Sequence, residues 1–231
     1  MISIIIPTYN EAEQIAKTIS QTYTANGIHE IEIIVADGGS TDETIRIAEK
    51  CGAIIVNGNR KGRAAQMNNG ASVAKYNVLF FLHADSIPPP DFTSQILNAC
   101  KNEVKSGCFR LAFDYNHWFL KANAWFTRLD VNAVRFGDQG LFATKGVFQK
   151  SGGFREDLLL MEDQEIVHRL KRNGSFKVLN DVVITSARKY IDNGIYRTQG
   201  IFFCIWAMYY LGYSQEQLLK VYRRLVRQYK S

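Results

Sequence analysis

The stretch that decides the fold is Val78-Leu79-Phe80-Phe81-Leu82-His83-Ala84-Asp85. Its run of apolar residues predicts a short strand that is buried on both faces, as in the interior of a parallel sheet. Ligands of open α/β sheets bind at the carboxyl ends of such strands, which is where His83 and Asp85 stand. Asp85 offers the oxygen ligand that Mg²⁺ and Mn²⁺ prefer. The alternative is that Asp85 only opens the turn before Pro88-Pro89-Pro90.

Strands and helices alternate along the rest of the chain. Three apolar runs before this stretch predict further strands, at residues 2–6, 30–36 and 53–56. Asn10 with Glu13, and Ser40 with Glu43, have the spacing of capping boxes, which predicts that helices start there. After the prolines, strands are predicted at residues 107–113 and 140–144, with an edge strand at 182–185. This alternation predicts an α/β fold with a mostly parallel central sheet flanked by helices.

The composition fits a globular domain with a C-terminal extension. The chain has 231 residues, 46% hydrophobic and 22% charged, and none of its apolar segments is long enough to cross a bilayer as a helix. Its start, Met1-Ile2-Ser3-Ile4-Ile5-Ile6, lacks the basic leader of a secretion signal, so we expect a cytoplasmic location. The scattered cysteines predict reduced thiols rather than a zinc site. The net charge of +6 favours an anionic partner.

Polar groups follow four of the predicted strands. They are Thr8-Tyr9-Asn10-Glu11, Asp37-Gly38-Gly39-Ser40, Lys61-Gly62-Arg63 and His83-Ala84-Asp85. Because the carboxyl ends of parallel strands share one edge of the sheet, these groups should lie together, and there they would suit a nucleotide. Tyr9 can lie against a base, Asp37 can accept a base N–H, and Arg63 can bind a phosphate. The alternative for each residue is a loop cap or a turn former.

Four segments, in this order, resemble a family 2 glycosyltransferase of the GT-A fold. They are Ile4-Ile5-Ile6-Pro7-Thr8-Tyr9-Asn10-Glu11, Val35-Ala36-Asp37-Gly38-Gly39-Ser40-Thr41-Asp42-Glu43-Thr44, Leu82-His83-Ala84-Asp85 and Met161-Glu162-Asp163. The resemblance, to a compact bacterial branch, implies a nucleotide-binding domain that uses a nucleotide-diphosphate sugar. It also implies hexosyl transfer with inversion, usually with Mg²⁺ or Mn²⁺ as cofactor. A UDP-sugar is favoured because Asp37 can accept the N3 proton of uracil, although guanine N1–H would serve equally.

The resemblance assigns donor-binding roles by position. The contacts to the nucleoside are Pro7, Tyr9, Glu11 and Asp37, and the diphosphate lies along Lys61, Gly62 and Arg63. Asp85 corresponds to the last carboxylate of the metal-binding DxD motif. His83 replaces the first carboxylate of that motif, where it can ligate the metal or donate to a phosphate. The alternative is a histidine that is merely packed and hydrogen-bonded.

Inversion needs a base on the face of the sugar opposite the leaving diphosphate. The resemblance assigns Asp163 as that base, with Glu162 beside it to bind an acceptor hydroxyl or tune the base. The alternative for Asp163 is a carboxylate that only favours the positive end of a helix dipole. Weaker assignments, to the acceptor pocket or to the diphosphate, are Gly137, Asp138, Gln139, Arg188 and Lys189.

The resemblance also divides the chain. Residues 1–190 would form the glycosyltransferase domain, with a nucleotide-binding half at 1–100 and an acceptor half at 101–190, and residues 191–231 a helical extension. The Gln-x-x-Arg-Trp stretch of processive members is missing, so we expect a single transfer per encounter. The donor partner is a nucleotide sugar, the acceptor is left open among saccharides, lipid-linked and small molecules, and no nucleic-acid partner is expected.

Other classes of protein compete with this interpretation. A nucleotidyltransferase would carry a glycine-rich basic loop after its first strand, and a dinucleotide-dependent oxidoreductase would carry G-x-G-x-x-G there. Here Pro7-Thr8-Tyr9-Asn10-Glu11 occupies that place, which disfavours both classes. A non-catalytic nucleotide-binding or membrane-surface module fits the two-sided helix predicted at about 215–229, although such a helix needs no partner if it is packed. An enzyme acting on a polyprenyl-phosphate acceptor would rest this helix and the apolar segment 201–213 on the inner face of the membrane. The basic side chains of that contact would be Arg223, Arg224 and Arg227.

Overall fold

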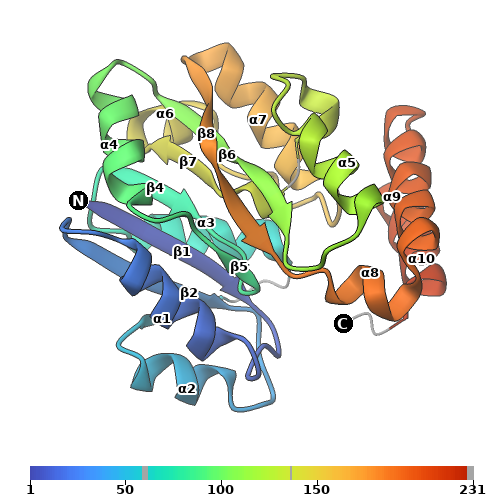
Figure 1. Cartoon of the computed structure of the whole chain (residues 1–231), viewed down its shortest axis with the longest axis horizontal. Helices are drawn as coiled ribbons and strands as arrows, with labels where there is room; N and C mark the ends of the chain where they lie inside the picture. Colours follow the sequence, from blue (N-terminus) through green and yellow to red (C-terminus); the bar gives the residue numbers. More distant parts are fainter. Residues whose placement is uncertain (59–61, 136, 228–231) are drawn as a thin grey trace.

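A single mixed sheet forms the centre of the protein (Figure 1). The computed structural model describes residues 1–58, 62–135 and 137–227. Within them the strands are β1 (Ile2–Thr8), β2 (Ile31–Asp37), β3 (Ile54–Asn57), β4 (Val78–Phe81), β5 (Ser86–Ile87), β6 (Ser106–Phe113), β7 (Leu141–Thr144) and β8 (Phe176–Thr185). Their order across the sheet is β3-β2-β1-β4-β7-β6-β8-β5. Only β7 and β5 run antiparallel to their described neighbours, so the predicted α/β class with a mostly parallel sheet is confirmed.

Helices cover both faces of this sheet. The described α-helices are α1 (Ile15–Ala25), α2 (Thr44–Lys50), α3 (Arg63–Val73), α4 (Phe92–Lys101), α5 (Trp118–Phe126), α6 (Lys145–Lys150), α7 (Glu162–Asn173), α8 (Arg188–Asn193), α9 (Ile195–Tyr210) and α10 (Gln215–Leu225), with short 3₁₀ turns η1 (Asn132–Val134) and η2 (Gly137–Gln139). Helices α1, α2 and α4 contribute to the apolar cluster on one face, which includes Phe80 and Phe109. Helices α3, α6 and α7 pack against Phe81 on the other. Strands β1 and β4 are buried on both faces, and their sequences are accordingly mostly apolar, with β4 apolar throughout.

The predicted capping boxes are wrong, and the residues concerned tie two loops together instead. Helix α1 begins at Ile15 and α2 at Thr44, and neither start has a side-chain cap. Asn10 adopts a left-handed conformation with φ of 52°, and its side-chain oxygen accepts a hydrogen bond from the Thr41 amide at 2.9 Å. The Ser40 hydroxyl accepts one from the Asn10 amide at 2.9 Å. Short polar side chains often prefer such backbone partners to a helix cap, and here they join the loops that follow β1 and β2.

Two strands are longer than the sequence patterns predicted. Strand β1 continues through Pro7, which lies opposite Ala36 in the ladder with β2. Strand β8 begins at Phe176 rather than at residue 182. It lies between β6 and β5, and β5 covers its last two residues, so the predicted edge strand is wrong at that end. The short β5 follows β4 directly and therefore brings the segment after Asp85 across to the end of β8.

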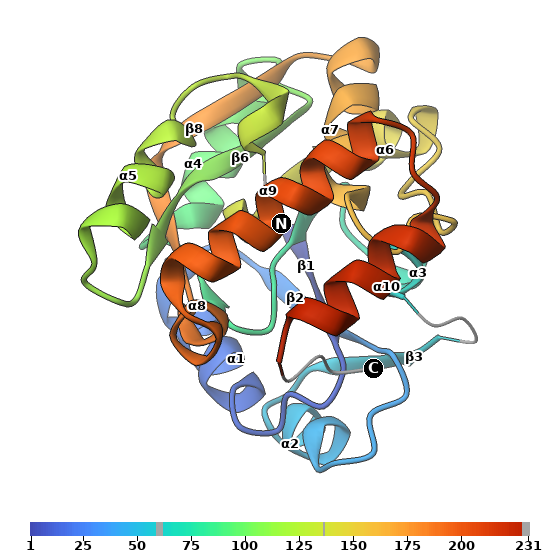
Figure 2. The same cartoon turned by 90° about the vertical axis from the view of Figure 1, so that its right-hand side faces the viewer.

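The C-terminal helices pack against the segment that precedes α7. Helices α9 and α10 lie side by side (Figure 2), and α10 begins with a capping box between Ser214 and Gln217. Ile205 of α9 and Tyr222 of α10 belong to one apolar cluster that also contacts Met161. Among the described residues, helices that combine the length and the apolar character needed to span a bilayer are absent. The predicted C-terminal extension therefore touches the part of the chain that carries Glu162 and Asp163.

Candidate active site

The carboxyl ends of β1, β2 and β4 meet at one edge of the sheet, as predicted. Thr8 of β1 lies opposite Asp37 of β2, and Ile5 lies opposite Phe81 of β4. Tyr9 and Glu11 follow in the loop after β1 and are half-buried. Pro7, in contrast, is buried within the strand. Of these predicted nucleoside contacts, the loop residues are therefore the better placed to meet a ligand.

Asp37 is held inside the turn that it opens. Its carboxylate accepts hydrogen bonds from the amides of Gly39 and Ser40, both at 2.7 Å, and from the Ser40 hydroxyl at 2.5 Å. The Thr8 hydroxyl adds a longer bond of 3.4 Å, and the residue is 1% exposed. A base N–H would thus meet a carboxylate that already accepts several hydrogen bonds, so Asp37 shapes the loop as much as it offers an acceptor.

An ion-pair cluster forms where α3 and α7 begin. Arg63, the first residue of α3, places its Nε atom 2.5 Å from Glu162 Oε1 and its Nη2 atom 3.6 Å from Asp163 Oδ2. Gly62 precedes it with φ of 119°, a conformation that favours glycine. Lys61, the other predicted diphosphate contact, lies outside the described residues. The fold therefore brings Arg63, predicted to bind the diphosphate, into contact with Asp163, predicted to be the base, although the two are far apart in the sequence.

Glu162 and Asp163 differ in their surroundings although they are neighbours. The side chain of Glu162 is 1% exposed and that of Asp163 is 17% exposed. Glu162 Oε2 is buried without a hydrogen-bond partner among the described residues. Burial raises the pKa of Asp163 to about 6, and the negative charge of Glu162 adds to the effect. Asp163 is thus a partly accessible carboxylate whose pKa lies near neutral pH, which suits a general base.

Gly137 holds the two halves of the cluster close together. A methyl group built at its α-carbon would overlap the Asp163 carboxylate and would lie 2.7 Å from His83 Nε2. The other ring nitrogen, His83 Nδ1, lies 2.5 Å from Asp138 Oδ1. Because the backbone of residue 137 runs between the carboxylate and the ring, only glycine fits there without displacing one of them.

His83 and Asp138 form a hydrogen-bonded pair. Burial alone lowers the pKa of His83, but the hydrogen bond and negative charge of Asp138 outweigh it and raise the pKa above its ordinary value. Burial likewise opposes ionisation of Asp138, but the bond to His83 lowers its pKa to about 2. The bond to Asp138 therefore favours the imidazolium form of His83, in which Nε2, the atom on the side of Asp163, is also a donor.

Asp85 lies among several other charged groups. Burial raises its pKa, and the negative charges of Asp138 and Glu11 add to the effect. Arg188 Nη2 lies 3.5 Å from Glu11 Oε2. Lys189 is also close enough to favour the charged form of Asp85. Acidic groups from the ends of β1, β4 and η2 thus share one region with two basic residues at the start of α8.

Gln139 and the C-terminal helices have roles that the sequence patterns did not indicate. Gln139 is 1% exposed and donates to the Phe109 carbonyl at 2.9 Å, so its amide fixes η2 to β6. Tyr222 of α10 is a hydrogen-bond partner of Lys189, whose ammonium lies 5.9 Å from the centre of the Tyr222 ring. The only signal for this contact was that Tyr222 stands on the apolar side of its helix. Helix α10 therefore reaches the edge of the candidate site.

The residues present fit a divalent cation whose remaining ligands come from a substrate. Groups of three or more His, Cys, Asp or Glu residues placed to hold a metal are absent from the part of the chain that is described. Mg²⁺, however, is commonly held by one or two carboxylates together with substrate phosphates and water. Burial raises the pKa of Asp85 most, and the negative charges of Asp138 and Glu11, which a bound cation would offset, raise it further. Asp85 is thus a suitable single protein ligand, whereas one nitrogen of His83 is already bound to Asp138.

The fold, a mostly parallel sheet flanked by helices, matches that of solved GT-A transferase structures. The mannosyltransferase PcManGT from Pyrobaculum calidifontis, solved in complex with GDP-Man and Mn²⁺, superposes with a TM-score of 0.71. The alignment covers 90% of this chain and 61% of that one at 18% sequence identity. A likeness at this identity shows the shared fold.

The sequence comparison then gives the family. Residues 3–159 match the family described as Glycosyl transferase family 2, and the chain belongs to that family. Glycosyltransferase AglE of Haloferax volcanii is 35% identical over 97 residues, which are 38% of this chain and 31% of AglE. The dolichol-phosphate mannosyltransferase of Pyrococcus furiosus is 30% identical over 106 residues, which are 44% of this chain and 30% of the relative. The matched segments thus span less than a third of either relative.

Proposed function

We propose that this chain transfers a hexose from a nucleotide-diphosphate sugar to an acceptor hydroxyl, with inversion and one transfer per encounter. The observation that carries the proposal is the position of Asp163. Its carboxylate starts α7, has a pKa raised to about 6 by burial, and lies beside Arg63 and His83 at the carboxyl edge of the sheet. A base next to phosphate-binding cations is what direct displacement requires.

The donor would lie along the same edge. In this proposal Tyr9, Glu11 and Asp37 meet the nucleoside, while Arg63 and Arg188 meet the diphosphate. A diphosphate beside Arg63 competes with Glu162 and Asp163 for the guanidinium, because phosphate oxygens accept charge-assisted hydrogen bonds equally well. Donor binding would therefore weaken the hold of Arg63 on Asp163 and leave that carboxylate to accept the proton of the acceptor hydroxyl.

Asp85 would hold a divalent cation at the diphosphate. When bound, Mg²⁺ or Mn²⁺ supplies Lewis-acid stabilisation of the leaving nucleotide. His83 contributes a positive charge on the same side, since its bond to Asp138 favours the imidazolium. Glu162 keeps Arg63 in place from its buried position and orients the residues next to the base.

A lipid-linked acceptor is the more specific candidate. The relative from Pyrococcus furiosus is a dolichol-phosphate mannosyltransferase by name, and a polyprenyl phosphate is an acceptor of the same chemical kind. On such an acceptor a phosphate oxygen would take the place of the hydroxyl, and Asp163 would accept the proton of the phosphate where it carries one. The surface also favours this candidate, because exposed aromatic side chains cluster on two neighbouring helices. They are Trp118, Trp125 and Phe126 on α5, and Tyr196, Phe203 and Tyr210 on α9. Trp and Tyr are the side chains enriched where proteins meet the bilayer interface.

Thermal unfolding with a panel of nucleotides tests the donor assignment. UDP, GDP and their sugar conjugates would each be added with Mn²⁺ and with a chelator. We expect one diphosphate to raise the midpoint temperature by mass action, more so with the metal. A binding module without activity would show the same shift but would release no nucleotide from the sugar conjugate on long incubation. If none of the nucleotides shifts the transition, the donor assignment is wrong.

A further inference from the structure

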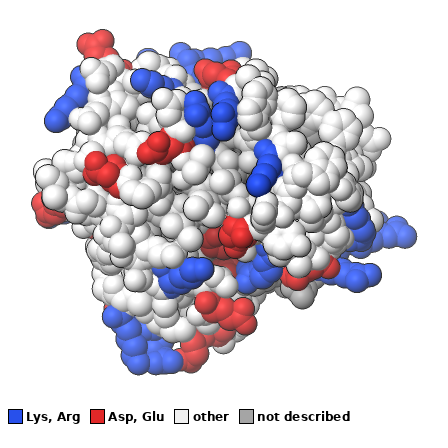
Figure 3. All heavy atoms as spheres, in the orientation of Figure 1, with Lys and Arg blue, Asp and Glu red and all other residues white. Residues whose placement is uncertain are grey.

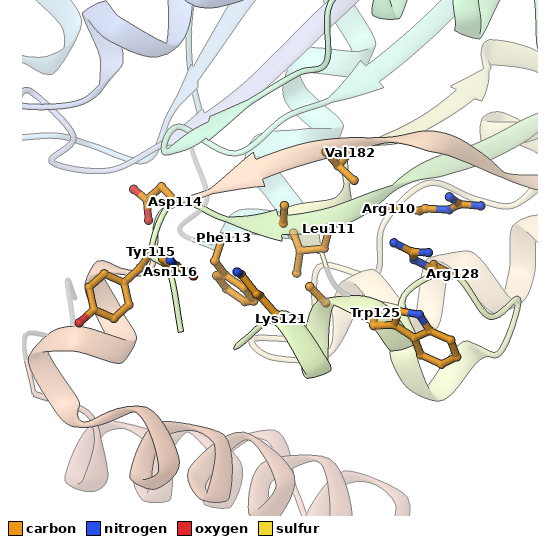
Figure 4. A pocket seen from close by; sticks show the side chains of 12 residues that line it. Arg110, Leu111, Phe113, Asp114, Tyr115, Asn116, Lys121, Trp125, Arg128 and Val182 are labelled. Carbon is orange, nitrogen blue, oxygen red and sulfur yellow. The ribbon is translucent and has the colours of Figure 1, made fainter. Parts of the chain in front are cut away.

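A cavity of about 550 Å³ lies between β6 and α5, and its lining shares no residue with the ion-pair cluster around Asp163 (Figure 4). This volume is in the range of small-molecule sites. Asp114, at one end, accepts a hydrogen bond from the Ala187 amide at 2.7 Å, and the next residue is Arg188. The Ser186 amide in turn donates to the Asp85 carbonyl at 3.2 Å. The segment 186–187 is therefore hydrogen-bonded both to Asp114 at the end of the cavity and to Asp85.

The cavity is lined by cations without acidic partners. Arg110 donates to the neutral side chain of Asn180 at 2.7 Å, and its Nε atom is buried with no hydrogen-bond partner. Lys121 of α5 and Arg128, which follows the end of α5, line the same space, and in Figure 4 Arg128 lies at the same end of the cavity as Arg110. Over residues 1–58, 62–135 and 137–227, none of the three pairs with a carboxylate. Two guanidinium groups at one end suit an anion with several acceptor oxygens.

The rest of the lining is apolar. Leu111 and Phe113 of β6, Val182 of β8 and Trp125 of α5 contribute to its walls. Trp125 is 51% exposed and Val182 is 37% exposed, so apolar area remains available to a ligand. Burial of apolar surface is a main source of affinity in such sites, and a small, fully hydrophilic anion would not cover this apolar wall. The lining therefore favours an anion that carries an apolar group.

The cavity adjoins the aromatic surface of α5 and α9. Asn123 of α5 donates to Gln199 of α9 at 2.9 Å, and the rings of Trp118 and Tyr196 are 6.4 Å apart, so the two helices present one surface. In Figure 3 the part of the molecule over these helices carries few charged side chains. Contiguous apolar surface of this kind marks an interaction site, and its aromatic composition suits the bilayer interface.

We propose that the cavity between β6 and α5 binds a phosphate monoester carried on an apolar chain, with the phosphate at Arg110 and Arg128 and the chain along Leu111 and Trp125. The aromatic surface of α5 and α9 would lie on the bilayer from which such a lipid comes. The role of this lipid as the sugar acceptor rests on the proposed function. Its binding to the cavity does not, because that binding can be measured whether or not a sugar is transferred.

Titration calorimetry with farnesyl phosphate tests the assignment. This probe combines a phosphate monoester with a short isoprenoid chain, and farnesol and inorganic phosphate supply each half alone. We expect farnesyl phosphate to bind at least about tenfold more tightly than either half, because both the guanidinium groups and the apolar wall contribute. Arg128→Gln should weaken it about tenfold, and Trp125→Ala should weaken it as well. Arg172→Gln, which removes the same charge from the exposed last turn of α7, should leave the affinity unchanged.

The outcomes separate this assignment from the proposed function. The nucleotide-induced thermal shift of Arg128→Gln should equal that of the unmodified protein, which also shows that the variant is folded. Equal affinity of Arg128→Gln and Arg172→Gln for farnesyl phosphate would overturn the site, and so would displacement of farnesyl phosphate by a nucleotide. Tight binding of farnesyl phosphate in a protein that binds no nucleotide sugar would support the site and reject the donor assignment.

Discussion

Two charged regions of this molecule differ in how their charges are balanced. In the cluster where α3 and α7 begin, Arg63 is shared by Glu162 and Asp163, and His83 is paired with Asp138. In the cavity between β6 and α5, neither Arg110 nor Arg128 is paired with a carboxylate of the described residues, and the lining Asp114 lies at the other end. A ligand of the first region must compete with ion pairs that the fold already makes, whereas a ligand of the second supplies the missing charge. Substitutions in the first region should therefore change both the stability of the protein and its transfer activity. Substitutions in the second region should change only the binding of its ligand.

The largest effect should come from the proposed base. Asp163→Asn keeps the shape of the side chain but removes its ability to take a proton, so we expect kcat to fall about 10²- to 10⁴-fold with little change in donor affinity. Steady-state assays of nucleotide release check this. Asp157→Asn is the matched control, because Asp157 is an exposed acidic residue paired only with Arg155 near the start of the same helix. Undiminished turnover in Asp163→Asn would remove the base from the mechanism.

The ion pair of Arg63 with Glu162 should show the next largest effect. Arg63→Gln leaves a carboxylate that is 1% exposed without its cation, and we expect the free energy of unfolding to fall by about 2–3 kcal/mol. Donor affinity should fall as well, since the guanidinium no longer meets the diphosphate. Urea unfolding and nucleotide titration measure the two effects separately.

A second substitution distinguishes the two roles of Arg63. In Arg63→Gln with Glu162→Gln, the uncompensated buried charge is gone, so most of the stability should return while the donor affinity stays low. Arg155→Gln removes one partner of an exposed pair and should cost less than about 1 kcal/mol. A double variant that regains donor affinity would show that Arg63 acts only on the fold.

The N-terminal half of the fold could be predicted from the sequence because its signals are local. An apolar run such as Val78–Phe81 that is buried on both faces, followed at once by polar residues, determines both a strand and the edge at which it ends. Asp85 and His83 were placed correctly at that edge for this reason. The signal for α7 is equally local, because Glu162 and Asp163 open an amphipathic helix that Gly174 follows.

The remaining features depend on contacts between distant segments. The approach of Tyr222 to Lys189 results from how α10 packs, and a single amphipathic helix does not indicate what its apolar side will meet. The cations Arg110 and Arg128 stand on different elements, and their shared cavity appears only when α5 lies beside β6. Asn10 and Ser40 had the correct spacing for caps, but a partner about thirty residues away was available to each.

Gly137 offers a smaller and more local way to disturb the first region. Gly137→Ala places a methyl group against the Asp163 carboxylate and the His83 ring, and we expect kcat to fall about tenfold to a hundredfold through their displacement. Gly146→Ala adds the same methyl group where the structure has nothing within 4 Å, so activity should not change. The comparison uses steady-state kinetics of both variants with thermal unfolding as a check on folding. Equal activity of the two variants would mean that the positions of Asp163 and His83 do not matter for transfer.

The smallest effect should be a shift in pH dependence. A base with a pKa of about 6 is active when ionised, so kcat should fall as the pH is lowered through 6 and should reach about a tenth of its plateau at pH 5. Glu162→Gln removes the neighbouring negative charge that helps to raise this pKa, and Arg63 then stabilises the Asp163 carboxylate alone, so the acidic limb should move to lower pH. Glu165→Gln, one turn further along α7 and paired with Arg169, should leave the limb in place. An acidic limb that stays near pH 6 in Glu162→Gln would show that another group controls it, and the proton acceptor would then have to be sought outside the cluster that Arg63 holds together.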